Sequence, residues 1–170
     1  MIVVVLGFKR NRNYDSVLRK ELIPFLKKKE TQIELLLVSG WQGEAEGLAV
    51  FLREEGLNLN IRLETQACRT FENIKFSFEI FKQLNLVPKE VIFIGEESSE
   101  MKVTWLAPKF SKRIFRSSIP FEFLPLPLLK SAGKEPSQFK MLLDLWLDKV
   151  SYYCPPISGF LTFLRKKHII

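Results

Sequence analysis

Residues 2–7 read Ile-Val-Val-Val-Leu-Gly, an uninterrupted β-branched and aliphatic run that stops at a glycine. Such a run predicts a strand buried on both faces, as in a parallel sheet. Comparable runs alternate with helical patterns along the next ninety residues. The expected strands cover residues 33–38, 59–63 and 91–94, and the expected helices cover 14–29, 42–55 and 70–84. This alternation predicts an α/β fold with a parallel, doubly wound sheet.

Three features modify this pattern. Pro24 lies inside the first helical segment and predicts a kink there. Ser98 or Ser99 is expected to cap a fourth helix that ends near Pro108, and residues 113–117 are a candidate fifth strand. Residues 121–127 have the pattern of extended chain at a sheet edge.

The C-terminal part has a different character. We expect a single α/β domain over residues 1–170, with a core at 1–127 and a C-terminal helical segment at 128–170. An apolar helix is expected from Ser137, and Pro155-Pro156 separates it from a short basic helix. We expect these C-terminal helices to pack on the sheet or its helices, with these side chains buried: Leu142, Leu143, Trp146 and Val150.

The composition excludes several classes of function. A net charge of +7 invites an anionic partner, but the basic residues are dispersed, so an ordinary basic surface is the alternative explanation. No motif indicates nucleic-acid binding. Two distant cysteines and a single histidine, His168, argue against a zinc site or a Ser-His-Asp triad. The sequence identifies no cofactor. With neither a signal-peptide pattern nor a membrane-length apolar run, the expected location is the cytoplasm.

The carboxyl ends of parallel strands meet at one edge of the sheet, where α/β proteins bind ligands. Candidate residues at that edge are Gly7, Arg10, Arg12, Ser39, Gly40, Glu44, Glu64, Thr70, Asn73 and Lys102. Structural explanations compete with a ligand site, because glycines permit tight turns and Thr70 is expected to be a helix N-cap. Asn73 is harder to explain structurally, since asparagine is a modest helix former and lies three residues beyond that cap.

The order of these residues resembles the YdcF/SanA-like family, domain of unknown function 218. The matching elements are Val5-Leu6-Gly7, Ser39-Gly40, Glu44-Ala45, Glu64 and Thr70-Phe71-Glu72-Asn73. Trp41 replaces a glycine of the family pattern, and Ala67 replaces its serine. After the fourth strand the match fails: Gly95-Glu96 replaces Thr-Ser, Ser99 stands at the position of a histidine, and Lys102 stands at that of an arginine.

The resemblance covers roughly residues 2–127. It implies a Rossmann-like three-layer α/β sandwich with about five strands, in a bacterial family whose biochemical activity is poorly defined. We hypothesise a pocket for an anionic, phosphate- or nucleotide-like small molecule, in a weak or degenerate hydrolase or transferase. Glu64 and Glu44 would act as acid and base or contact ligand hydroxyls. Ser39, Thr70 and Asn73 would hydrogen-bond the ligand.

Positive charge in this pocket would come from Lys102, together with Arg10 or Arg12. The alternative is a non-catalytic binding or interaction protein that keeps the fold without the chemistry. The missing family histidine favours this alternative, because it removes the best general acid or base. The sequence leaves the oligomeric state open.

Overall fold

A computed structural model describes residues 1–7, 12–128 and 137–167. Five strands form one sheet in the order β3-β2-β1-β4-β5, and every neighbouring pair is parallel. The strands are β1 (Ile2–Leu6), β2 (Leu35–Ser39), β3 (Ile61–Glu64), β4 (Val91–Glu96) and β5 (Phe121–Leu126). The α/β, Rossmann-like architecture is therefore confirmed.

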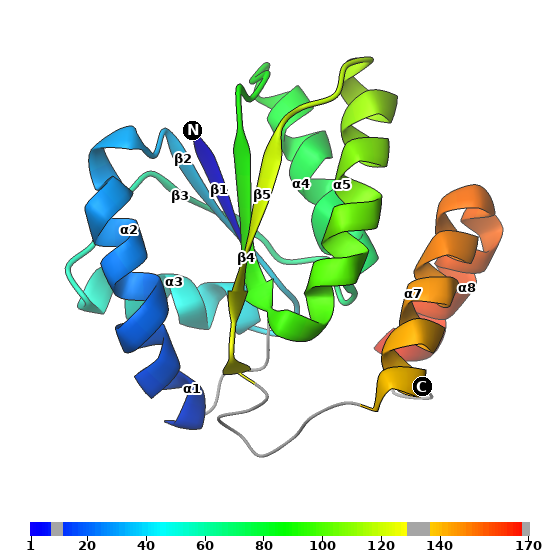
Figure 1. The fold of residues 1–170 in the computed structure, drawn as a ribbon, viewed down its shortest axis with the longest axis horizontal. Coiled ribbons are helices and arrows are strands. Elements are labelled where there is room, and N and C mark those ends of the chain that lie inside the picture. The colour runs from blue at the N-terminus through cyan, green and yellow to red at the C-terminus, as the bar shows by residue number, and fades with distance from the viewer. Residues whose placement is uncertain (8–11, 129–136, 168–170) are drawn as a thin grey trace.

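Helices cover both faces of this sheet (Figure 1). On one face lie α1 (Arg12–Val17), α2 (Ile23–Lys29) and α3 (Glu44–Glu54), and on the other lie α4 (Thr70–Gln83) and α5 (Glu100–Phe115). Each face has its own apolar core. Alternate residues of the fully buried β1 contribute to the two cores, Val3 and Val5 to the first, Ile2 and Val4 to the second.

The first helical segment changes its helix type just before Pro24. A π-helical turn spans Leu18–Leu22 between α1 and α2, and Pro24 falls in the first turn of α2. The backbone stays helical through Leu22 and Ile23, and the Ile23 N–H donates to the Leu18 backbone oxygen in the π-helical pattern. The predicted kink is thus a change of helix type.

The fifth strand differs from the prediction. Residues 113–117 do not form a strand, because α5 continues through Pro108 to Phe115. The fifth strand is instead β5, the segment predicted to be extended at the sheet edge, and it pairs in parallel with β4 from Val91↔Phe121 to Glu96↔Leu126. Local propensity is only one contribution to the stability of a helix. The apolar face that α5 buries stabilises it, so the helix continues through Pro108.

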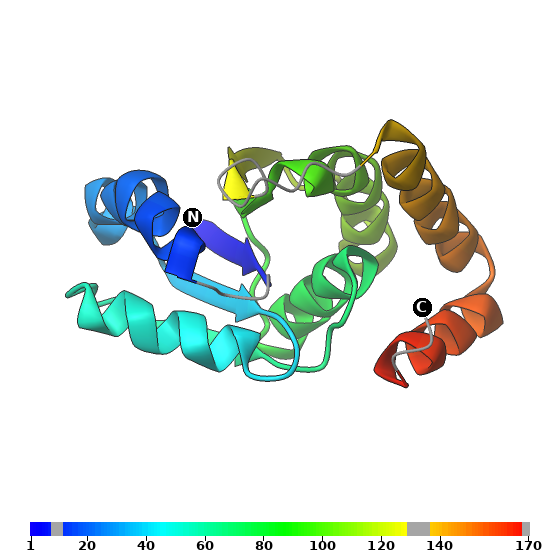
Figure 2. The same ribbon diagram turned by 90° about the horizontal axis from the view of Figure 1, so that it is seen from below.

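The C-terminal helices α7 (Gln138–Tyr153) and α8 (Pro155–Lys166) form a hairpin beside α5 (Figures 1 and 2). Cys154 ends α7, and Pro155 begins α8 in the position that proline favours. Leu142, Leu143 and Trp146 are 58%, 44% and 58% exposed, so the prediction that they are buried was wrong.

The strand order places the topological switch point between β1 and β4. From β1 the chain proceeds outward to β2 and β3, then returns across the sheet to β4 and β5. The loops therefore diverge at the carboxyl ends of β1 and β4, where open α/β sheets bind ligands.

Candidate functional site at the carboxyl edge of the sheet

Three adjacent strands bring predicted site residues to the same edge. Leu6 of β1 is in register with Ser39 of β2, and Ser39 is in register with Glu64 of β3. The N–H of Gly40 also donates to the backbone oxygen of Glu64 at 2.9 Å. The fold therefore juxtaposes residues that are far apart in the sequence.

Ser39, Glu64 and Asn73 form a buried polar cluster that joins β2, β3 and α4. Ser39 Oγ lies 2.5 Å from Glu64 Oε2 and 2.9 Å from Asn73 Oδ1. All three residues are at most 5% exposed. Asn73 is thus buried and in contact with Ser39, a structural reason for its presence that the sequence did not reveal.

The serine hydroxyl has one proton and faces two acceptors, so it donates to only one of them. Two arrangements satisfy the cluster. A protonated Glu64 donates to Ser39, which donates to Asn73; alternatively, the Asn73 amide is turned, so that it donates to Ser39 and Ser39 donates to an ionised Glu64. The cluster therefore couples the orientation of an amide to the charge of a carboxyl group.

Glu64 also fixes the loop that leads into α4. Its Oε1 accepts from the backbone N–H groups of Gln66 at 2.6 Å and Ala67 at 3.0 Å. Burial raises the pKa of the Glu64 carboxyl above its ordinary value of 4.5, and the donors from Ser39 and the loop oppose this rise. Both carboxyl oxygens are engaged, so the loop uses Glu64 as an anchor.

Gly7 and Gly40 allow the ends of β1 and β2 to approach closely. A Cβ atom on Gly7 would lie 2.5 Å from Gly40 Cα, 2.5 Å from the Ser39 backbone oxygen and 2.8 Å from Glu44 Oε2. Only glycine leaves this space. The Glu44 carboxylate, at the first position of α3, consequently lies against both strand ends, and it accepts from the N–H of Trp41 at 3.3 Å.

Thr70 is not the N-cap of α4. The cap position belongs to Arg69, whose backbone is extended, and no side chain caps this helix end. Cys68 and Glu72 supply the local stabilisation: Glu72 Oε2 accepts from the Cys68 N–H at 2.9 Å and from its thiol at 3.2 Å. Burial, followed by the adjacent Glu72, raises the pKa of the Cys68 thiol to about 11.

The structure directs Lys102 toward the C-terminal hairpin. Its Nζ lies 3.5 Å from Asp144 Oδ2 of α7, and its side chain is 14% exposed. Arg10 lies outside the described residues, and Arg12 begins α1 with a side chain that is likewise outside them. Of the three predicted cations, only the side chain of Lys102 is therefore described, and it is paired with α7.

Two cations that the sequence analysis did not select reach this edge from α8. Lys166 Nζ lies 6.0 Å from the centroid of the Trp41 ring, and Arg165 Nη1 donates to the backbone oxygen of Cys68 at 3.4 Å. Thr162 on the same helix donates to Glu72 Oε1. The only hint in the sequence was the basic character of the final helix, since its position depends on the hairpin.

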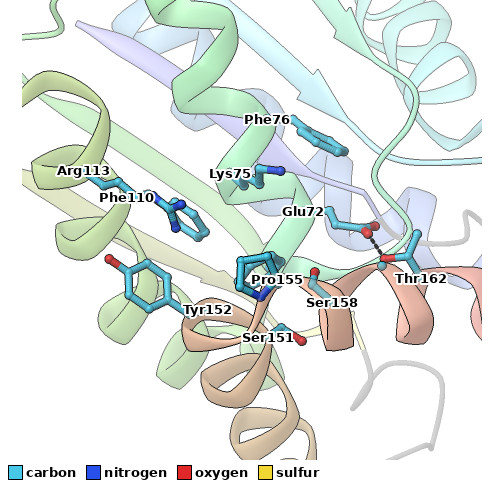
Figure 3. A pocket seen from close by; sticks show the side chains of 12 residues that line it. Glu72, Lys75, Phe76, Phe110, Arg113, Ser151, Tyr152, Pro155, Ser158 and Thr162 are labelled. Carbon is cyan, nitrogen blue, oxygen red and sulfur yellow. Dashed lines mark hydrogen bonds between the residues drawn. The ribbon is translucent and has the colours of Figure 1, made fainter.

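A separate cavity of about 320 Å³ lies between the hairpin and the α4–α5 layer (Figure 3). Its walls combine aromatic rings, hydroxyls and charges of both signs: Phe71, Glu72, Lys75, Phe76, Phe110, Arg113, Ser151, Tyr152, Pro155, Ser158, Gly159 and Thr162. The Glu72–Thr162 hydrogen bond crosses one end of it. Ser39, Glu44 and Glu64 do not line this cavity, so it is distinct from the strand-end cluster.

Comparisons with known proteins identified no relative of this chain. No protein-family model, no curated protein and no solved structure matches this chain. Within the described ranges, no group of three His, Cys, Asp or Glu side chains could hold a metal ion. Any functional conclusion therefore rests on the geometry of the site.

Proposed function

We propose that the protein binds an anionic, phosphate- or nucleotide-like small molecule at the carboxyl edge of its sheet, as a divergent member of the YdcF/SanA-like family. The observation that carries this proposal is the close approach of Gly7 and Gly40, which leaves the Glu44 carboxylate against the ends of β1 and β2. A carboxylate in this position suits the hydroxyl groups of a sugar, because it accepts their hydrogen bonds.

The charge for the anionic group comes from α8 in this proposal. Arg165 and Lys166 lie beside Cys68 and Trp41, at the same edge as Glu44. They replace Lys102, which is paired with Asp144. The first-turn N–H groups of α4 add partial positive charge. Phosphate would contact α8 while ligand hydroxyls contact Glu44.

A hydrolase or transferase activity at this edge would use the carboxyl groups of Glu44 and Glu64 as acid and base. Both carboxyl oxygens of Glu64 contact other groups, Ser39 on one side and the N–H groups of Gln66 and Ala67 on the other, so a reaction at Glu64 must release one of these hydrogen bonds. The non-catalytic alternative keeps the same ligand contacts without a reaction. It is favoured by the absence of the family histidine, since the position that it would occupy holds Ser99.

Thermal-shift measurements with inorganic phosphate, nucleotides, sugar phosphates and uncharged sugars test this function. We expect sugar phosphates or nucleotides to raise the melting temperature more than neutral sugars do. Glu44→Gln should weaken the response to ligands with hydroxyls, and Lys166→Ala should weaken the response to the phosphate group. Isothermal titration of the best compound then gives the change in Kd.

Two control variants make the test specific. Lys89→Ala removes one exposed cation at the opposite, amino-terminal end of β4 and should leave the ligand response unchanged. Lys102→Ala should also leave it unchanged, because Lys102 pairs with α7. Equal stabilisation by neutral sugars, or a Lys166→Ala variant that responds like the wild type, would refute the charge assignment.

A further inference from the structure

The α7–α8 hairpin is turned with its polar side toward the rest of the protein. Asp148 and Ser151 are the buried residues of α7, and no residue described in α8 is buried. Arg69 Nη2 donates to Asp148 Oδ1 at 2.5 Å and to Ser151 Oγ at 3.2 Å. This arrangement inverts that of α4, whose apolar side faces the core.

Large apolar side chains consequently occupy the outer face of the hairpin, at 38% to 76% exposure. We call this set the outer face: Phe139, Leu142, Leu143 and Trp146 of α7, with Ile157, Phe160 and Phe163 of α8. The first four are separated by three, one and three residues, the spacing of a single helical stripe. Exposed apolar residues scattered singly are ordinary, whereas seven on one hairpin indicate an interaction site.

The charges around the outer face are positive. The sequence has no acidic residue after Asp148, whereas Lys140 and Lys167 are exposed at the start of α7 and the end of α8. Asp144 and Asp148 are each within ion-pair distance of a cation from the core, Lys102 and Arg69. The hairpin therefore offers an apolar and cationic surface whose own carboxylates are already paired.

We propose that the outer face docks on an anionic lipid surface, with α7 and α8 lying in the plane of the membrane interface. Aromatic and aliphatic side chains would enter the boundary of the acyl region, and the lysines would contact anionic headgroups. Trp146 suits this depth because its indole has an apolar body and a polar N–H.

Length and charge favour this occupant over others. At about 1.5 Å per residue the 16-residue α7 is roughly 24 Å long, short of the roughly 30 Å hydrocarbon core. Among the helices that the structure describes, none is long and apolar enough to cross a membrane. A second copy would bring the same positive charge to the contact, whereas an anionic bilayer is complementary to it.

Vesicle flotation of the full chain tests the proposal. We expect flotation with vesicles that contain phosphatidylglycerol, weak flotation with pure phosphatidylcholine vesicles, and loss of binding as salt increases. Trp146→Ser with Phe160→Ser should lower the vesicle partition coefficient by at least about tenfold, because both rings leave the interface. Lys140→Glu with Lys167→Glu should lower binding to anionic vesicles alone.

Val87→Ser is the matched control, since Val87 is 69% exposed in the loop before β4, outside the hairpin. It should float like the wild type. Melting temperatures of all variants should agree, because the substituted side chains are exposed. No flotation of the wild type, or equal flotation of the Trp146→Ser and Phe160→Ser variant, overturns the proposal. Light scattering tests the remaining alternative. A wild-type dimer that dissociates in the Trp146→Ser and Phe160→Ser variant would assign the outer face to contact with a second copy, which also overturns the proposal.

Discussion

Arg69 and Asp148 form an ion pair that joins the start of α4 to the C-terminal hairpin across 79 residues of sequence. The Nη2–Oδ1 distance is 2.5 Å, and the two side chains are 6% and 4% exposed. Burial raises the pKa of the Asp148 carboxyl, while Arg69 and Lys102 oppose the rise. Arg69 Nη1 is buried and has no partner among the described residues. The hairpin is thus held by this buried ion pair together with the Tyr152 ring, which packs edge-on against Trp105 and Phe110.

Removing this carboxylate should be strongly destabilising. Asp148→Ala leaves a buried guanidinium uncompensated, so we expect a loss of about 3–5 kcal/mol in the free energy of unfolding. Asp144→Ala is the matched control: its pair with Lys102 is 3.5 Å long and more exposed, and its loss should cost less than about 1 kcal/mol. Urea unfolding followed by circular dichroism measures both. Equal losses would show that the buried pair has no special role.

Glu64→Gln should flatten the pH dependence of stability. The folded pKa of Glu64 is raised above 4.5, so the native state binds the proton more tightly than the unfolded state. The resulting contribution of Glu64 to the free energy of unfolding is complete below pH 4.5, and it is lost as the pH rises through the folded pKa. Glutamine can keep the contacts by donating to Ser39 and accepting from the loop. Urea unfolding from about pH 4 to pH 7 checks this. Asp148, whose pKa is also raised, supplies a residual slope of the same sign. Identical slopes for variant and wild type would contradict the prediction.

Asn73→Ala should lower stability by about 1–3 kcal/mol, because it removes a buried partner of Ser39. Asn58→Ala, at an exposed position, should change stability by less than about 0.5 kcal/mol. Thermal and urea unfolding give both values. A stable Asn73→Ala variant with weakened ligand binding would restore Asn73 to the wall of the ligand site.

Gly7→Ala should prevent normal folding or shift the strand ends, because the added Cβ would meet backbone atoms of β2 at 2.5 Å. Gly47→Ala introduces the same methyl group in α3, where no atom of the described residues lies within 4 Å of the added Cβ. That variant should gain about 0.5–1 kcal/mol, since alanine is the better helix former. Expression in soluble form and melting temperature compare the two. Similar stability of both variants would refute the close approach of β1 and β2.

Cys68 should react slowly with iodoacetamide, because its pKa of about 11 leaves little thiolate near pH 8. Glu72→Gln replaces the carboxylate by a neutral, weaker acceptor and so removes the nearby negative charge, which should accelerate alkylation. A fall of one pKa unit would increase the thiolate fraction about tenfold. A Cys154→Ser background isolates the signal, which mass spectrometry records. Unchanged alkylation in Glu72→Gln would assign the slow reaction to burial alone.

The sequence by itself determined the alternation of the first four strands and helices along the chain. It also indicated the sheet edge at which the polar residues gather. Ile2–Leu6 is apolar at every position, which requires burial on both faces, and parallel pairing then brings Ser39 and Glu64 together. The end of α5 and the place of β5 were not determined locally. In the sequence, Pro108 is compatible with a helix end and with a helix interior. The packing of the apolar face of α5 determines which of the two forms.

Only the tertiary structure decided the partners of individual side chains. Lys102 was correctly placed near the start of α5, but its flexible chain pairs with Asp144 of a distant helix. The apolar stripe that contains Trp146 has the same spacing as the stripe of α4, yet one faces outward and the other inward. Periodicity reveals that a helix has an apolar side. What covers that side depends on the other contacts of the helix, and here the buried Arg69–Asp148 pair turns the polar side inward.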